Sequence, residues 1–280
     1  MSFACPLGTD AHRRLEEVVS VKNPLILEKI DDGRKMLGTS AFITGHTYPA
    51  GLFAFSTLSR YVNERRLTTN VWRELLRFAY HVVSVIDVPL VFTKIGTDAR
   101  IEAWADSSMA RPEALCRAPG GYLIRLGHPD GRASGTLMCS SQLPRKAMSS
   151  TGGSELEQVV RAIKSVLGLR IYFKELQQPR LVLGPTPVFT DASVVVDGTN
   201  CRRVSREMKW VCLNYAIVRQ AVGDGGVTIV KCATEDNAAD GLTKPLTGKA
   251  FTRSQRMLQG FPPPTGGEPA AADDEDATAL

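Results

Sequence analysis

The chain has 280 residues, 43% of them hydrophobic and 22% charged, and it carries a formal net charge of +5, a balance typical of one large or two modest globular domains. No stretch approaches the roughly 18 uninterrupted apolar residues of a membrane helix, and the N-terminus shows no secretory signal, so no membrane partner is expected. The six cysteines lack C-x-x-C spacing and none of the four histidines stands beside one, which argues against zinc and favours an intracellular protein, cytoplasmic or nuclear.

The N-terminal part of the chain divides into two segments. Residues 1–35 are polar and mixed, which predicts a poorly ordered leader. Residues 36–96 predict a mainly helical region, because apolar side chains recur near helical spacing, with a break at Pro49 and Gly51.

Two further elements are expected within this helical region. A second helix is predicted from about Thr69, which would serve as its N-cap. The following Val85–Phe92 is rich in β-branched residues and contains Pro89, which indicates a short edge strand.

Residues 97–261 predict an α/β domain with a mixed five-stranded sheet flanked by helices. The expected strands are 100–105, 121–126, 135–140, 187–190 and 227–232. The expected helices are a long one starting at Ser154, one over 208–222, and a short one around Ala238.

The end of the chain differs in composition from the rest. Residues 262–280 are rich in Pro, Gly and Ala and hold five acidic residues but no Lys or Arg, which predicts a disordered acidic tail. Residues 1–261 therefore carry 34 basic and 24 acidic side chains. This excess suits a polyanionic partner, although many equally basic proteins bind none.

Four acidic residues stand at positions that suit a common site. Asp106 and Asp191 each follow an apolar strand, Glu155 lies in the expected first turn of the long helix, and Asp240 opens the short one. Carboxylates brought together in this way repel one another unless a divalent metal compensates them, and paired Mg²⁺ or Mn²⁺ ions suit phosphodiester cleavage.

Each of these acids also has an ordinary structural explanation. A strand-end Asp is most often a turn residue, and Asp240 could simply cap its helix. Ser154-x-x-Glu157 reads as a capping box, which explains Glu157 without catalysis and leaves Glu155 free to face the sheet edge.

Motifs around these acids resemble the ribonuclease H domain at the end of copia-type retrotransposon Pol polyproteins. The motifs are Ala105-Asp106-Ser107-Ser108, Arg117 to Tyr122, Ser149-Ser150-Thr151 through Glu155-Leu156, and Asn237-Ala238-Ala239-Asp240-Gly241-Leu242-Thr243-Lys244-Pro245-Leu246. More weakly, Met36 to Ser40, Leu58 to Tyr61 and Trp72-Arg73 resemble the segment that connects reverse transcriptase to this domain. The aromatic-x-Asp-Asp strand of a reverse transcriptase is absent, so no polymerase activity is expected.

The resemblance implies a ribonuclease H fold that cuts the RNA strand of an RNA–DNA hybrid. It implies two Mg²⁺ or Mn²⁺ ions held by four catalytic ligands, Asp106, Glu155, Asp191 and Asp240. Candidate contacts to nucleic acid are Ser107, Arg145, Lys146, Arg202, Arg203 and Arg206, and the reverse transcriptase portion of the same polyprotein is a candidate partner.

The sequence also departs from this family in several places. Met208-Lys209-Trp210-Val211 replaces the usual Thr/Ser-Lys-His-Ile, and Cys139 stands in place of a Trp in the third strand. A second hypothesis therefore remains, in which the domain is a catalytically inactive or domesticated module that binds RNA or hybrid.

Overall fold

The computed structural model describes residues 25–92, 98–108, 117–128, 132–144, 150–201 and 211–261. The expected acidic tail and most of the expected leader lie outside these ranges, as do the candidate contacts Arg145, Lys146, Arg202, Arg203 and Arg206. Within the described ranges, no helix combines the length and the apolar character needed to cross a membrane.

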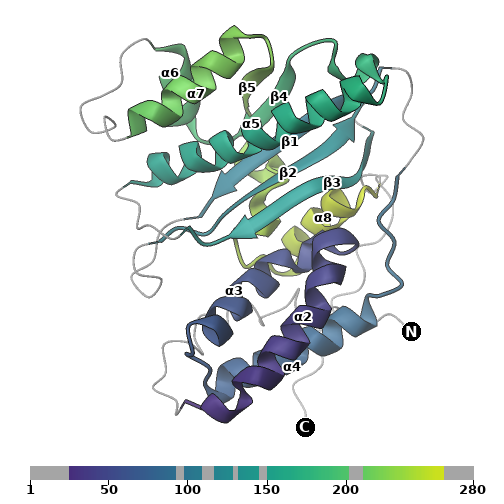
Figure 1. Ribbon diagram of the computed structural model, residues 1–280, viewed down its shortest axis with the longest axis vertical. Coiled ribbons are helices and arrows are strands. Elements are labelled where there is room, and N and C mark those ends of the chain that lie inside the picture. The colour runs from purple at the N-terminus through teal and green to yellow at the C-terminus, as the bar shows by residue number, and fades with distance from the viewer. Residues whose placement is uncertain are drawn as a thin grey trace.

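Three helices pack together in the N-terminal part: α2 (Ile30–His46), α3 (Leu52–Asn63) and α4 (Thr69–Ser84). Figure 1 shows them on one side of the sheet, drawn in purple and blue. Their apolar faces form a core of their own, made by Ile30, Leu37, Ala54, Leu58, Tyr61, Val62, Leu67, Val71, Leu75, Phe78 and Val82. The expected helical character of this region is therefore observed.

Three expectations for this region are wrong in detail. Helix α2 begins inside the expected leader, because Ile30 is buried against the neighbouring helices. The N-cap of α4 is Thr68 rather than Thr69, and the Thr68 side chain accepts a hydrogen bond from the backbone amide of Val71. No strand forms over residues 85–92; the Val91 carbonyl makes one contact with β3, accepting a hydrogen bond from the amide of Gly135 at 2.6 Å.

The rest of the described chain is built around a mixed sheet of five strands. These are β1 (Arg100–Ser107), β2 (Gly120–Gly127), β3 (Ala133–Gln142), β4 (Thr186–Thr190) and β5 (Val227–Lys231). Their order in the sheet is β3-β2-β1-β4-β5, with β1, β2 and β3 antiparallel and with β4 and β5 parallel to β1. The five-stranded mixed sheet predicted from the sequence is confirmed.

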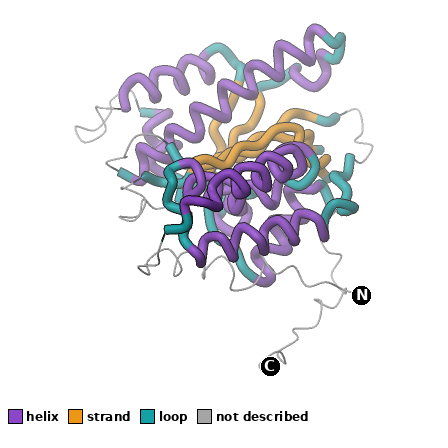
Figure 2. Tube along the Cα trace, turned by 60° about the horizontal axis from the view of Figure 1, so that its bottom comes forward, coloured by secondary structure: helices purple, strands orange, loops and turns teal. Residues whose placement is uncertain are grey.

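Helices cover both faces of this sheet, as Figures 1 and 2 show. One face carries α5 (Thr151–Glu175), α6 (Ser193–Asn200) and α7 (Cys212–Gly223), and the other carries α8 (Gly248–Gln259). The sequence pattern predicted α5 and α7 but neither α6 nor α8.

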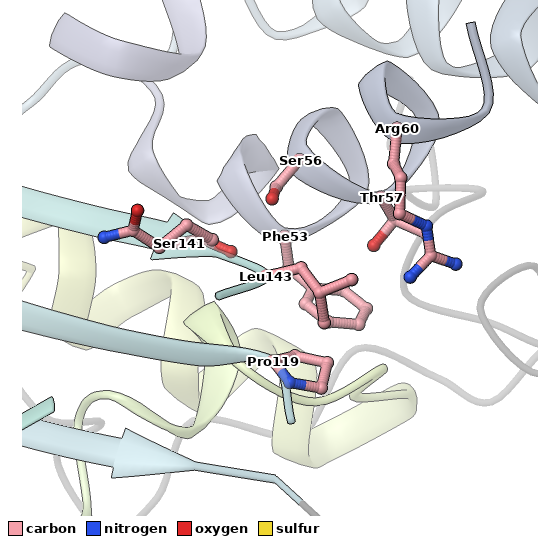
Figure 3. A pocket seen from close by; sticks show the side chains of 8 residues that line it. Phe53, Ser56, Thr57, Arg60, Pro119, Ser141 and Leu143 are labelled. Carbon is pink, nitrogen blue, oxygen red and sulfur yellow. The ribbon is translucent and has the colours of Figure 1, made fainter. Parts of the chain in front are cut away.

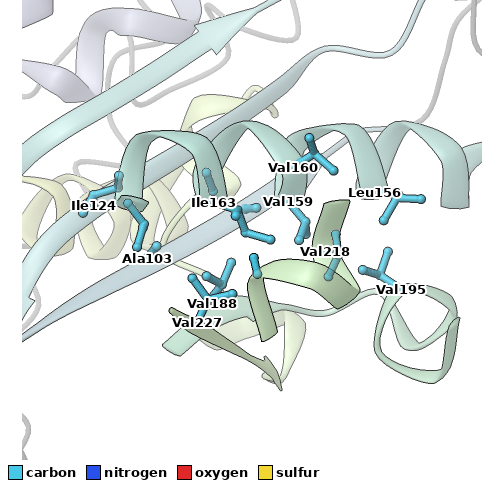
Figure 4. Close-up of a cluster of buried hydrophobic side chains, with 14 of the residues drawn as sticks. Ala103, Ile124, Leu156, Val159, Val160, Ile163, Val188, Val195, Val218 and Val227 are labelled. Carbon is cyan, nitrogen blue, oxygen red and sulfur yellow. The ribbon is translucent and has the colours of Figure 1, made fainter. Parts of the chain in front are cut away.

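Each face has its own apolar core. On the α5 face, Figure 4 shows side chains of the helix pointing at the strands, with Val159 and Ile163 beside Ala103 and Val188. On the α8 face the core also includes residues of the N-terminal helical part, and this shared packing joins the two parts of the chain. Its buried members are Tyr48, Ala50, Val85, Trp104, Leu123, Ala238, Ala239, Leu242, Phe251 and Leu258.

Candidate metal centre

Two neighbouring parallel strands bring Asp106 and Asp191 to the same edge of the sheet. Trp104 of β1 pairs with Phe189 of β4, and their rings stack with centroids 4.9 Å apart. Because side chains alternate along a strand, the acid two residues beyond each ring lies on the same face as that ring. Asp106 lies within β1 rather than after its end, since β1 extends to Ser107.

Helix α5 supplies Glu155, but it begins earlier than the sequence predicted. Its N-cap is Ser150, whose hydroxyl accepts a hydrogen bond from the Gly153 amide at 3.1 Å. The predicted capping box is therefore wrong, and Ser154 instead donates its hydroxyl to the carbonyl of Thr151 at 2.7 Å. Glu155 consequently lies in the second turn of the helix rather than the first.

The carboxylates of Asp106, Glu155 and Asp191 converge. One carboxylate oxygen of each lies within 4.8 Å of the other two. Asp106 is 1% exposed and Glu155 is 7% exposed, so two of the three acids are buried. The backbone amide of Ser107 donates to Glu155, while Glu155 Oε2 has no hydrogen-bond partner among the described residues.

The fourth predicted acid, Asp240, reaches the cluster beside a lysine. Asp240 opens a 3-10 helix (Asp240–Leu242), and Lys244 follows four residues later. The Lys244 ammonium lies 2.8 Å from Asp240 Oδ1 and 3.5 Å from Asp106 Oδ2. The two acids thus share one cation supplied by the chain itself.

Two more residues hold the Asp106 carboxylate. The Thr243 hydroxyl donates a hydrogen bond to Asp106 Oδ2, and the side-chain amide of Asn237 donates one to Asp106 Oδ1 at 3.4 Å. The site predicted from the sequence includes neither of these residues, nor Lys244. The signal that could have found them is the closing motif from Asn237 to Leu246, of which the predicted site contains only Asp240.

Burial and crowding change the protonation of the acids. Burial raises the pKa of Asp106 from 3.8 to about 6, although Lys244 lowers it and Asp240 raises it further. Burial raises the pKa of Glu155 from 4.5 to about 9, and the neighbouring Asp106 and Asp191 add to this effect. Burial also raises the pKa of Asp240, against the opposing effect of Lys244.

These residues fit a hard divalent cation. Carboxylate oxygens are the donors that Mg²⁺ and Mn²⁺ prefer, and three of them already lie close enough to share one ion. The unpartnered oxygen of Glu155 and its raised pKa both show that the chain alone leaves this carboxylate uncompensated.

Comparisons with known proteins find similar polyproteins. The Pol polyprotein of transposon RE2 from Arabidopsis thaliana is 24% identical over 94% of this chain, and that of transposon RE1 is 25% identical over 58%. The chain resembles retrotransposon Pol polyproteins. The resemblance predicted from the sequence is thereby confirmed, and the chain spans only 17% and 10% of the length of these two relatives.

No protein-family model matches the chain. Among solved structures, LC11-RNase H1 isolated from compost aligns with a TM-score of 0.38 and 18% identity, over 55% of this chain and 97% of its own. The foamy viral protease–reverse transcriptase in complex with double-stranded DNA aligns with a TM-score of 0.41 and 12% identity, over 78% of this chain and 40% of its own.

Among the candidate contacts to nucleic acid suggested by the retrotransposon resemblance, only Ser107 lies within the described residues. Its side chain is 4% exposed, and its hydroxyl donates to the carbonyl of Pro119 at 3.3 Å. A buried hydroxyl with this partner does not face a polyanion. Ser107 instead supports the site through its backbone amide, which donates to Glu155.

A small hollow lies where α3 meets the ends of β2 and β3. Figure 3 shows Phe53, Thr57 and Arg60 of α3 on one side, with Pro119 and Leu143 on the other. Its volume of about 20 Å³ leaves room for little more than one water molecule. It is therefore a packing gap between the helical part and the sheet, and we assign no ligand to it.

Proposed function

We propose that this chain carries a metal-dependent endonuclease domain that cleaves the RNA strand of RNA–DNA hybrids. The observation that carries the proposal is the convergence of Asp106, Glu155 and Asp191 from three separate elements, with ligand atoms within 4.8 Å of one another. Their arrangement at the end of a mixed sheet agrees with the catalytic site expected from the retrotransposon resemblance.

The roles of the residues follow from their surroundings. Asp106, Glu155 and Asp191 would hold the metal, which when bound lowers the pKa of water and stabilises negative charge on the phosphate. Thr243 and Asn237 fix the orientation of Asp106, and the Ser107 amide fixes Glu155. Of the two ions predicted from the sequence, this set of ligands supports one directly.

The proposed substrate rests on charge and on the closing motif. Residues 1–261 carry 34 basic against 24 acidic side chains, which favours a polyanion. The motif from Asn237 to Leu246 supplies Asn237, Asp240, Thr243 and Lys244, and all four reach the carboxylate cluster. The reverse transcriptase portion of a longer polyprotein remains the proposed partner.

A cleavage assay on the full chain tests the proposal. An RNA–DNA hybrid labelled on either strand is incubated with Mg²⁺, with Mn²⁺ or with EDTA, beside double-stranded RNA and double-stranded DNA. We expect cleavage of the RNA strand of the hybrid alone, and only with a metal. Cleavage that persists in EDTA, or that spreads equally to double-stranded RNA, would contradict the proposal.

One observation favours a second function, a module that binds hybrid without cleaving it. Lys244 already neutralises part of the cluster, so the fold does not depend on a bound metal to compensate Asp106 and Asp240. Such a module would bind hybrid with an affinity that falls steeply as salt rises, and it would release no cleaved product.

A further inference from the structure

The carboxylate cluster contains a cation of its own, and this bears on how many metal ions it takes. We propose that Lys244 permanently occupies the position between Asp106 and Asp240, so that the cluster binds a single divalent ion, held by Asp106, Glu155 and Asp191. The inference rests on the proposed function and concerns the same site.

The first support is the position of the Lys244 ammonium. It lies 2.8 Å from Asp240 Oδ1 and 3.5 Å from Asp106 Oδ2, so one cation supplied by the chain contacts both acids. The Lys244 side chain is 31% exposed, against 18% for Asp240 and 1% for Asp106, so the ion pair lies partly out of water.

The second support is that the backbone fixes Lys244 beside Asp240. The amides of Thr243 and Lys244 both donate to the Asp240 carbonyl, at 3.1 and 3.0 Å. Leu242, in the same turn, is fully buried in the core on the α8 face. The turn therefore holds the Lys244 backbone where its side chain reaches both carboxylates.

The third support is the contrast between the two sides of the cluster. On the Asp240 side, the oxygens of Asp106 accept from Thr243, Asn237 and Lys244. On the Glu155 side, a 93% buried carboxylate keeps one oxygen without a partner among the described residues. The chain thus completes one side itself and leaves the other side for a cation from solution.

The charges agree with a single ion. Four carboxylates and one ammonium carry a formal charge of −3, which one divalent ion reduces to −1. A second ion between Asp106 and Asp240 would have to displace the Lys244 ammonium, which already contacts both acids.

Counting bound Mn²⁺ tests this inference without reference to cleavage. Equilibrium dialysis and titration calorimetry of the full chain should give one Mn²⁺ for the wild type and for Lys244→Arg, which keeps the charge. Lys244→Met should bind two, because it keeps the length of the side chain but removes the cation. Lys249→Met, at an exposed position on α8, is the control and should bind one.

A second variant keeps the test decisive even if Lys244→Met fails to fold. Asp240→Asn should still bind one Mn²⁺ with an affinity within roughly threefold of the wild type, because the proposed ion does not use Asp240. Loss of the ion in this variant would overturn the inference, as would one ion in a folded Lys244→Met.

The count for the wild type separates the two proposals. Two Mn²⁺ ions bound by the wild type would overturn the role of Lys244 and leave the metal-dependent site intact. No bound Mn²⁺ would overturn the metal site itself, and the inference with it.

Discussion

Asp106 and Glu155 are both buried carboxylates of one cluster, yet they differ in how many partners the protein gives them. Three side chains, from Thr243, Asn237 and Lys244, contact Asp106. Glu155 receives only the backbone amide of Ser107, and its Oε2 has no partner among the described residues. The pKa of Asp106 rises to about 6, whereas that of Glu155 rises to about 9.

This difference shows that burial alone does not set the pKa of a carboxylate in the cluster. Burial raises both pKa values, but the nearby ammonium of Lys244 holds Asp106 closer to its ordinary range. The Glu155 side remains uncompensated at neutral pH unless a proton or a metal is present. Variants and conditions that act on one side only should therefore change metal binding and stability in different ways.

The largest effect is expected from Asp106→Asn, because Asp106 belongs to both sides. A carboxamide is a poor ligand for Mg²⁺ beside carboxylates, so cleavage of the hybrid should fall roughly 100-fold or more, about 2.7 kcal/mol in activation free energy. Hybrid binding in EDTA, measured by fluorescence anisotropy, should persist, because one negative charge facing the phosphates is gone. Full metal-dependent cleavage by this variant would show that the assignment of the site is wrong.

Metal should stabilise the protein more at high pH than at low pH. The raised pKa of Glu155 means that its contribution to stability is present below about pH 4.5 and is lost as pH rises toward about 9. The raised pKa of Asp106 causes the same kind of loss of stability between about pH 3.8 and about pH 6. Mn²⁺ binds the ionised forms, so its stabilising effect should grow over this window.

Melting curves at several pH values measure this effect. At pH 8, Mn²⁺ at 100 times its dissociation constant should stabilise the fold by about 2.7 kcal/mol, and at pH 5 by much less. Calorimetry in buffers of different ionisation enthalpy should show protons released as the metal binds. An equal shift in melting temperature at pH 5 and pH 8 would contradict the assigned protonation of the cluster.

A smaller effect is expected from Glu155→Gln in the absence of metal. Glutamine fills the same space without an ionisable group, so in EDTA at pH 8 the free energy of unfolding should rise by about 1–3 kcal/mol. At pH 5 the gain should vanish, because Glu155 is then protonated in the folded state. The variant should also lose the stabilisation by Mn²⁺.

Glu102→Gln is a matched control for this experiment. Glu102 is 8% exposed, but it forms an ion pair with Arg100 at 3.3 Å. Its replacement removes a compensated charge, so it should give no gain in stability at either pH. A gain as large as that of Glu155→Gln would mean that general burial, and not the cluster, produces the effect.

The strands were predictable because their apolar runs are short and bounded by turn residues, whereas two helices were not. Helix α8 has few apolar positions, and it is defined by Phe251 and Leu258 packing against a sheet that the local pattern cannot show. The start of α5 was misplaced because Gly152 and Gly153 are poor helix formers, which made Ser154 look like the first cap.

The site was predictable only in its acids. Asp106, Glu155 and Asp191 stand out only as a set, because each alone has an ordinary structural explanation, whereas acids that follow neighbouring strands share one end of a sheet. The roles of Asn237, Thr243 and Lys244 depend on a tertiary contact between the end of the domain and its first strand, 131 to 138 residues away in sequence. No local pattern shows that contact.

The smallest effect is expected from Glu157→Gln, two residues from Glu155 on the same helix. Glu157 does not cap α5 as we expected; it pairs with Arg161 at 2.9 Å, with side chains 26% and 30% exposed. A partly exposed i,i+4 pair contributes only about 0.3–0.5 kcal/mol, and glutamine can still accept the hydrogen bond from Arg161. Stability should therefore change by less than about 0.5 kcal/mol, and the cleavage rate by less than about twofold. Parallel denaturation and cleavage measurements on Glu157→Gln and Glu155→Gln check this. If Glu157→Gln abolished cleavage while Glu155→Gln retained it, Glu157 rather than Glu155 would be the carboxylate that α5 presents to the metal. The contrast with Asp106 would then concern Glu157.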